Sequence, residues 1–461
     1  MGGLRRQSAG SVSYDEIRRM MIQTGAQRDV QVASRGVRRR FVQTAVLLFL
    51  LAFSVRMAKL LYRPPSFEAP QVEMVQVAHS LLRNGFLGNP YAIETGPTAH
   101  ELPIYPVLLA GIYRLFGETP RGEGVKYLLT ITLASLQYAL LPALAQAVGL
   151  QPSIGVVAGL MGALLPVQFY METAGNHESH LTGLVLLALS LLALRFGGRS
   201  GTLADCALFG AACGVGALVS SQVIPVSAGL LGFLVWPSLK GSLGRRLAAT
   251  GLVVAVAMSV LFPWALRNRI MLGEWIWTRS NFGLELYVSN HDRALPILDD
   301  QLRAGLLRQL HPHSNVALAA QLREQGEAAY HREKLRQALA WIQTHPGRFL
   351  RLTLARMWYF WFPPGTGTLN ELLNHTIVIL AFVGFGLTAM RHRRAALLCG
   401  ILLGMFPLVH YVVQVTMRYR YPIHWTLLLL ASVTLVECAG RLGIPRWIQA
   451  AGMAPAKESG K

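Results

Sequence analysis

The sequence predicts an all-α, polytopic membrane protein of about ten transmembrane helices. Of its 461 residues, 52% are hydrophobic and 14% are charged, whereas soluble domains carry about 25% charged residues. The charges gather in a few stretches and leave apolar runs near the roughly 20 residues that cross a bilayer. Arginine and lysine also recur beside those run ends that fall on one side of the membrane, as the positive-inside rule requires.

Ten apolar runs are long enough, or nearly long enough, to be spans. An eleventh run, 102–116, is too short, contains two prolines and an arginine, and would invert the charge pattern of every later loop if it crossed. We therefore expect it to lie on the outer surface as an interfacial helix. The ten predicted spans are 41–61, 125–148, 153–171, 181–195, 203–220, 223–236, 247–264, 373–390, 395–415 and 421–438.

The distribution of charge predicts the side of the membrane that each loop occupies. Residues 1–40 contain nine arginines and three acids, so this tail should be cytoplasmic. Alternation through the spans then places the tail 441–461 inside and leaves two large segments outside, 62–124 and 265–352. In the second, the polar stretch Val316–Thr344 predicts an amphipathic helix or a helix pair. Arg56, in the outer half of the first span, must snorkel or face the protein interior.

The formal net charge of +20 would suggest nucleic-acid binding in a soluble protein. Here the positive-inside rule accounts for much of the excess, so we expect no nucleic-acid partner. Membrane lipids are the expected surroundings of the chain.

The first outer segment is acidic in an otherwise basic protein. A carboxylate just outside the first span, such as Glu68, can ligate a divalent cation or take a proton from an acceptor hydroxyl. The alternative is that the acids of this segment are solvated surface groups. Its charged residues include Glu68, Glu73, Glu94 and Glu101, against Arg63 and Arg83.

A second polar site is predicted in the outer turn 172–180. His177 and His180 are three residues apart, whereas a zinc-protease helix needs two histidines four apart on one face. Zinc hydrolysis is therefore disfavoured. Glu178 is instead expected to point towards the first outer segment, and a polar turn between two helices is the alternative.

Further polar groups gather at the outer ends of later spans. Guanidinium groups at a membrane boundary suit the bidentate capture of a lipid phosphate, although an arginine there is also a common interfacial anchor. The candidates for binding the substrate or its lipid phosphate are Arg267, Asn268, Asn281, Arg418 and Arg420.

These motifs resemble the GT-C glycosyltransferases of bacteria, membrane enzymes that use polyprenyl-phosphate-sugar donors. The chain looks most like family 39 members of the dolichyl-phosphate-mannose protein mannosyltransferase type, and more distantly like the lipid A aminoarabinose transferase. The resemblance covers about residues 41–437 and is most specific in the first outer segment, in Pro263-Trp-x-x-Arg267-Asn268 and in Arg418-Tyr-Arg-Tyr-Pro422. It implies a GT-C-like bundle in a bacterial inner membrane, with 41–440 as the catalytic domain.

The resemblance also implies roles for individual residues. The class commonly carries Asp-Glu after the first helix as the catalytic or metal-associated acid. Here Phe67-Glu68 stands at that place, so Glu68 inherits the role and the first acid is absent. Glu178 matches the place of a second acid, and His100 matches a residue that binds the donor phosphate or the acceptor. A divalent cation, Mg²⁺ or Mn²⁺, is an optional cofactor between Glu68 and Glu178.

The implied reaction is a direct displacement at the anomeric carbon. Glu68 would deprotonate or orient the hydroxyl of a lipid, glycan or protein acceptor while the lipid phosphate leaves. His100 and the arginines would offset the developing charge. Two alternatives stay open. One is an O-antigen ligase or polysaccharide polymerase. The other is a transporter or flippase of lipid-linked substrates, which would concentrate polar residues at the midplane.

Overall fold

The computed structural model describes residues 39–62, 72–166, 178–196, 202–365 and 367–441. Helices dominate this part of the chain, and the β-type pairings within it are two isolated bridges, Gly88 with Pro97 and Ile297 with Val415. Seven helices in the described part are long and apolar enough to cross a membrane, and four shorter ones are also apolar. The prediction of an all-α, multi-pass membrane protein is therefore confirmed.

The seven long helices match seven of the predicted spans. The other three predicted spans are helical but shorter, and α5, with 13 residues, covers about 20 Å of a hydrocarbon core of roughly 30 Å. Ten crossings therefore stay a prediction. The long helices are Arg39–Tyr62, α4 (Pro120–Ala147), α7 (Glu178–Arg195), α11 (Leu243–Leu272), α18 (Thr368–Arg391), α19 (Arg393–Met405) with α20 (Leu408–Val412), and η2 (Met417–Arg420) with α21 (Tyr421–Arg441). The shorter ones are α5 (Pro152–Leu164), α8 (Leu203–Val219), and α9 (Val223–Leu230) continued by η1 (Leu231–Val235) and α10 (Trp236–Ser238).

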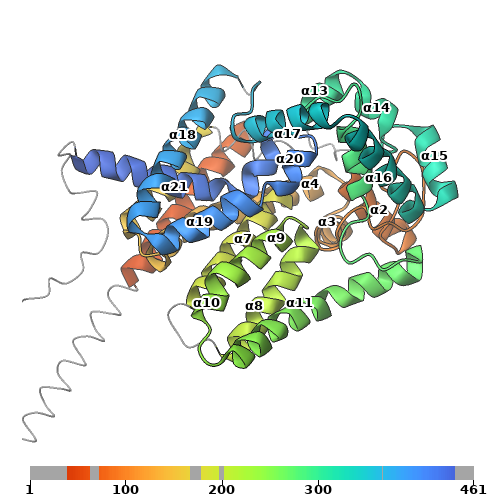
Figure 1. Ribbon diagram of the computed structural model, residues 1–461. Coiled ribbons are helices and arrows are strands. Elements are labelled where there is room, and N and C mark those ends of the chain that lie inside the picture. Colours follow the sequence, from red (N-terminus) through yellow and green to blue (C-terminus); the bar gives the residue numbers. More distant parts are fainter. Residues whose placement is uncertain (1–38, 63–71, 167–177, 197–201, 366, 442–461) are drawn as a thin grey trace, which may run out of the picture.

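The remaining helices belong to the two predicted outer segments, except that the last of them continues beyond residue 352 to Trp361. Figure 1 shows α2, α3 and α13 to α16 together on the right of the view, beyond one end of the bundle. The apolar helix α3, predicted to be interfacial, packs on α2 through a small core that includes Met74, Tyr105 and Leu109. The helices are α2 (Glu73–Asn84), α3 (Ile104–Phe116), α12 (Phe282–Ser289), α13 (Leu298–Arg303), α14 (Leu306–Leu310), α15 (Val316–Gln325), α16 (Glu327–Thr344) and α17 (Pro346–Trp361).

The polar stretch predicted as a helix or helix pair forms the pair α15 and α16. Gly326 separates the two helices and has a φ of 80°, a conformation that glycine adopts at little steric cost. One face of α16 is buried and includes Glu327, His331 and Lys334. The pair therefore presents charged residues to the interior of the outer segments as well as to the surface.

The core of the bundle is built around α21. All residues from Tyr421 to Thr434 are buried, and α21 packs against α18, α5 and α7. Gly384 of α18 lies so close that an added β-carbon would overlap the carbonyl oxygen of Leu430. Small residues let helices approach in this way in membranes, where packing supplies much of the association energy. The N-terminal end of α21 is therefore buried, together with Met417 and Arg420 of the turn η2.

Arg56 faces the interior, the second of its two predicted environments. It is 3% exposed, and its Nη2 donates to the carbonyl oxygen of Gly162 at 2.9 Å. Its guanidinium carbon lies 4.9 Å from the ring centre of Tyr138. The charge thus satisfies a carbonyl at the end of α5, where the helix itself offers no donor.

Candidate functional site

Three charged side chains from separate segments meet where α7 begins. Arg279, in the loop after α11, donates from Nη2 to Oε1 of Glu178 at 3.5 Å and also to Oε2 of Glu101. Glu101 is 6% exposed, whereas the side chain of Glu178, the first residue of α7, is 16% exposed. We call Glu101, Glu178 and Arg279 the carboxylate–arginine cluster.

Burial determines the charge of this cluster. It raises the pKa of Glu101 to about 8, against the opposing effect of Arg279. Burial also disfavours the charge of Arg279, but Glu101 and Glu178 outweigh that effect and raise the pKa of Arg279. At neutral pH, a mostly protonated Glu101 therefore lies beside a charged guanidinium. The Nε of Arg279 is buried and has no hydrogen-bond partner among the described residues.

A second group of polar side chains surrounds His100. Its Nδ1 lies 3.0 Å from Oη of Tyr91, and its Nε2 lies 3.4 Å from Nδ2 of Asn281. Glu73 and His311 complete a set in which one ligand atom from each residue lies within 4.8 Å of the others. We call Glu73, His100 and His311 the histidine cluster.

The pKa values of the two histidines of this cluster shift in opposite directions. Burial lowers the pKa of His100 well below its ordinary value, and His311 lowers it further. Burial also disfavours the charge of His311, but the interaction with Glu285 outweighs it and raises the pKa of His311. The carboxylate of Glu285 lies 3.8 Å from Nε2 of His311. His100 is therefore a neutral imidazole, which suits a metal ligand better than a group that offsets negative charge.

Arg267 and Asn268, in the last turns of α11, bind backbone groups. Arg267 donates from Nη1 to the carbonyl oxygen of Thr98 at 2.6 Å and from Nη2 to that of Leu87 at 2.6 Å. The amide of Asn268 accepts from Arg267 at 2.9 Å and donates to the carbonyl oxygen of Ile276 at 2.8 Å. Both residues thus hold the loops around the site. A role in binding the lipid phosphate stays a prediction for both.

Arg420 lies inside the bundle. It has no exposed surface and donates from Nη1 to the carbonyl oxygen of Phe360 at 3.1 Å. Its Nη2 donates to Oδ1 of Asn374. These bonds join η2 to the end of α17 and the start of α18, so the guanidinium has a structural task.

Arg418, unlike Arg420, is only partly buried. Its guanidinium carbon lies 5.5 Å from the ring centre of Tyr419. Tyr419 is in turn near enough to Arg279 to contribute to the raised pKa of that residue. Of the two predicted arginines in η2, Arg418 is the more exposed, and a role in binding the lipid phosphate stays a prediction for it.

Comparisons with known proteins identify no family. No protein-family model matches the sequence, and no curated protein is significantly similar to it. Among solved structures, the oligosaccharyltransferase of Archaeoglobus fulgidus in complex with Zn and sulfate matches with a TM-score of 0.46 at 12% identity. The match covers 88% of this chain and 50% of that one, so this chain spans about half the length of that protein. A likeness of this size carries no argument about activity.

The histidine cluster has donors that suit a transition-metal ion. Two imidazole nitrogens and one carboxylate oxygen are accepted by Zn²⁺ or Mn²⁺, whereas Mg²⁺ prefers six oxygen ligands. If Nδ1 of His100 donates to Tyr91, a bond of the kind that commonly orients a ligating histidine, its Nε2 can bind a cation in place of its contact with Asn281. His311 would ligate after releasing a proton. The ligands predicted from the sequence differ: Glu178 pairs with Arg279, and Glu68 lies outside the described residues.

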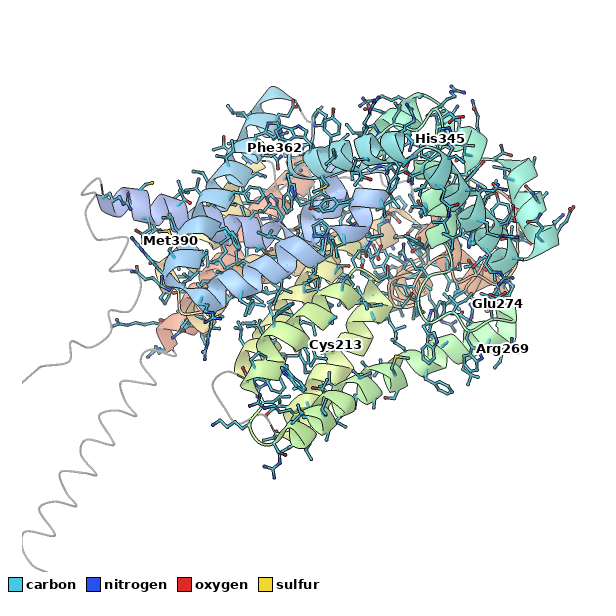
Figure 2. All side chains as sticks on the ribbon, in the orientation of Figure 1. Cys213, Arg269, Glu274, His345, Phe362 and Met390 are labelled. Atoms are coloured by element: carbon cyan, nitrogen blue, oxygen red, sulfur yellow. The ribbon has the colours of Figure 1, made fainter. Side chains whose placement is uncertain are left out.

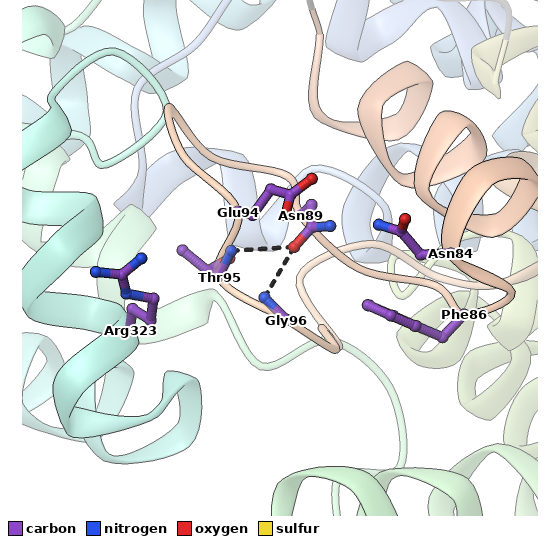
Figure 3. A pocket seen from close by; sticks show the side chains of 7 residues that line it. All are labelled: Asn84, Phe86, Asn89, Glu94, Thr95, Gly96 and Arg323. Carbon is purple, nitrogen blue, oxygen red and sulfur yellow. Dashed lines mark hydrogen bonds between the residues drawn. The ribbon is translucent and has the colours of Figure 1, made fainter.

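An open hollow of about 590 Å³ lies between the first outer segment and α15. Figure 3 shows Glu94 and Arg323 on its two sides, with the ring of Phe86 and the amide of Asn84 further along. Asn89 shapes one wall, because its Oδ1 accepts from the backbone N–H groups of Thr95 at 3.0 Å and Gly96 at 2.8 Å. The hollow contains none of the residues of the two clusters, so it is not their binding cavity.

The sequence located part of this site and missed the rest. Glu101, for which a solvated surface position is the alternative predicted from the sequence, is buried. Arg279 directly precedes Ser280-Asn281 but is not among the residues predicted from the sequence. His311 belongs to the run His311-Pro-His313, whose paired histidines were a usable signal. No local sequence pattern predicts the contacts of Tyr91 or of Glu327 with the site, because these contacts depend on which segments pack together.

Proposed function

We propose that this protein is a membrane glycosyltransferase that moves a sugar from a polyprenyl-phosphate donor to an acceptor hydroxyl. The reaction would occur on the outer side of a bacterial inner membrane, with both tails in the cytoplasm. The observation that carries the proposal is the carboxylate–arginine cluster. Two acids and an arginine, drawn from three segments, meet at the first residue of a helix long enough to span the membrane. A lipid-anchored phosphate and a water-soluble acceptor can both reach such a boundary.

The proposed reaction is one displacement. The acceptor oxygen forms a bond to the anomeric carbon, and the bond from that carbon to the phosphate oxygen breaks. The electron pair stays on the leaving polyprenyl phosphate, which gains one negative charge. The acceptor proton passes to a carboxylate, so the leaving group needs no proton of its own.

The carboxylate–arginine cluster has groups for both halves of this reaction. Glu178 is the more exposed of its two acids and is the proposed base, a role that the sequence resemblance also gives to Glu68. Arg279 has a buried Nε without a partner among the described residues, which can donate to the leaving phosphate as its charge grows. Glu101, held neutral by burial, can donate a hydrogen bond to the same phosphate.

The histidine cluster and Arg418 supply the proposed surroundings of the donor. When bound, a divalent cation would add positive charge near the phosphate, and Glu73, His100 and His311 would hold it. Arg418, the more exposed of the two arginines in η2, is the proposed anchor for the lipid phosphate. Asn281, whose amide contacts His100, is proposed to orient the sugar.

The proposal is tested with purified protein in lipid nanodiscs and polyprenyl phosphates that carry a radiolabelled hexose or pentose. Wild-type protein should release polyprenyl phosphate and transfer the label, and Glu178→Gln should reduce the rate at least about 100-fold. The matched control is Glu274→Gln. Glu274, labelled in Figure 2, follows the C-terminal end of α11 and pairs with Arg332 on the surface. No release of polyprenyl phosphate from any donor, or movement of intact donor across the membrane instead, would contradict the proposal.

A further inference from the structure

Glu327 is a buried acid with three hydrogen-bond donors around it. It is the first residue of α16 and is 6% exposed. Its Oε1 accepts from the backbone N–H of Ala99 at 2.8 Å and from the hydroxyl of Ser280 at 2.6 Å. Its Oε2 accepts from the hydroxyl of Thr98. An ionised carboxylate offers only acceptors, so all three bonds suit the charged form although burial raises the pKa of Glu327.

The partners of Glu327 are the chain neighbours of the site residues. Ala99 directly precedes His100 and Glu101, and Ser280 directly follows Arg279. The two partners are also joined to each other, because the N–H of Ser280 donates to the carbonyl oxygen of Ala99 at 2.9 Å. One carboxylate therefore closes a junction between the loop that carries Glu101 and the loop that carries Arg279.

The helix behind this junction is itself held firmly. His331, one turn after Glu327 on α16, lies with Nε2 at 3.2 Å from Oη of Tyr91, the same hydroxyl that contacts His100. On its other side, α16 packs so tightly on α12 that a β-carbon on Gly283 would overlap the carbonyl oxygen of His331. Helix α16 thus contacts the site loop at two points and cannot shift easily.

We propose that Glu327 is a positioning residue, which holds Glu101 and His100 in register with Arg279 for the transfer reaction. The inference rests on the proposed function. Glu327 does not touch the reacting atoms, because its three bonds go to the backbone and hydroxyls beside the site. Its effect on catalysis would come from geometry, since a displacement of about 1 Å in a reacting group is enough to cost roughly 100-fold in rate.

The test compares Glu327→Ala and Glu327→Gln with Glu333→Gln, an acid on the exposed side of the same helix. Glu327→Ala removes all three acceptors and should lower kcat about 100-fold with less than about a threefold change in the KM of the donor. Glu327→Gln keeps one oxygen for Ala99 and Ser280 and should recover most of kcat. Glu333→Gln should match wild type. A loss confined to KM, or no recovery in Glu327→Gln, would overturn the positioning role.

Amide hydrogen exchange tests the junction independently of activity. In Glu327→Ala, the amides of Ala99 and Ser280 should exchange at least about 10-fold faster than in wild type, while Glu333→Gln leaves them unchanged. Unchanged exchange would show that Glu327 does not hold the junction. Faster exchange with unchanged kcat would show that its role is purely structural. A wild-type protein that transfers no sugar would instead refute the proposed function, and the exchange data would still decide whether Glu327 holds the junction.

Discussion

The Nη2 of Arg279 lies 3.5 Å from Oε1 of Glu178, although 101 residues separate them. The same nitrogen reaches Glu101, from which Arg279 is separated by 178 residues. One guanidinium therefore joins both outer segments to the beginning of α7. Removing it leaves two acids facing each other in a partly buried place, which is unfavourable for both.

We expect Arg279→Gln to reduce sugar transfer at least about 100-fold, because under the proposed function the leaving phosphate loses a charged hydrogen-bond donor. The initial rate of polyprenyl-phosphate release measures the effect. The control is Arg332→Gln, which removes a more exposed arginine that pairs with Glu274. Equal rates in the two variants would mean that Arg279 has no part in the chemistry.

The kcat of Glu101→Gln should differ from that of wild type only at high pH. Burial raises the pKa of Glu101 to about 8, so at about pH 6.5 the wild-type side chain is mostly neutral and glutamine is a good substitute. Above that pKa the wild-type acid ionises, glutamine cannot, and the two pH–rate profiles diverge. The measurement is kcat between about pH 6 and pH 9. If kcat of Glu101→Gln is more than about tenfold below that of wild type even near pH 6, the reaction needs the ionised form of Glu101 over the whole pH range.

Zn²⁺ should bind to the purified protein at the histidine cluster. Titration of metal-free protein with Zn²⁺, followed by calorimetry and metal analysis, should give one site, and His311→Ala should weaken it at least about 10-fold. His345→Ala is the control, because His345, labelled in Figure 2, is exposed at the junction of α16 and α17. Unaltered affinity in His311→Ala would place the ion elsewhere.

Substitutions of the two arginines of η2 should have different effects, one on stability and the other on substrate binding. Arg420→Met leaves the carbonyl oxygens of Phe360 and Trp361 without their donor and should lower the free energy of unfolding by about 2–4 kcal/mol. Arg418→Met should leave the melting temperature nearly unchanged and raise the KM of the donor. Fluorimetric melting curves and donor titrations measure the two effects. The reverse pattern would make Arg420 the phosphate ligand.

The outer placement of the site can be checked by labelling intact cells, after Cys438→Ser removes the exposed native cysteine. Arg323→Cys on α15 should react with an impermeant maleimide from outside, because α15 belongs to the second outer segment. Lys240→Cys, in the exposed loop between α10 and α11, should react only after the membrane is opened. Labelling in the opposite order would invert the predicted topology.

Several local expectations agree with the structure because their causes are local. Each of the ten apolar runs is helical over most of its described residues, although the run 395–415 is helical only to Val412, and the stretch Val316–Thr344 forms a helix pair broken at Gly326. Apolar length and a single glycine are readable from a few residues of sequence. The site is different: Glu178 was predicted to point towards the first outer segment, but its actual contact with that segment runs through Arg279.

By itself, the sequence determined that the chain is a helical membrane protein with acids and arginines gathered outside its spans, because crossing a bilayer depends on runs of about 20 apolar residues. Only the tertiary structure decided that Arg420 is interior, that Arg279 joins Glu101 to Glu178, and that Glu327 holds the loops between them. These outcomes depend on contacts across tens to hundreds of residues. A buried charge takes whichever partner the packing of distant helices brings within reach.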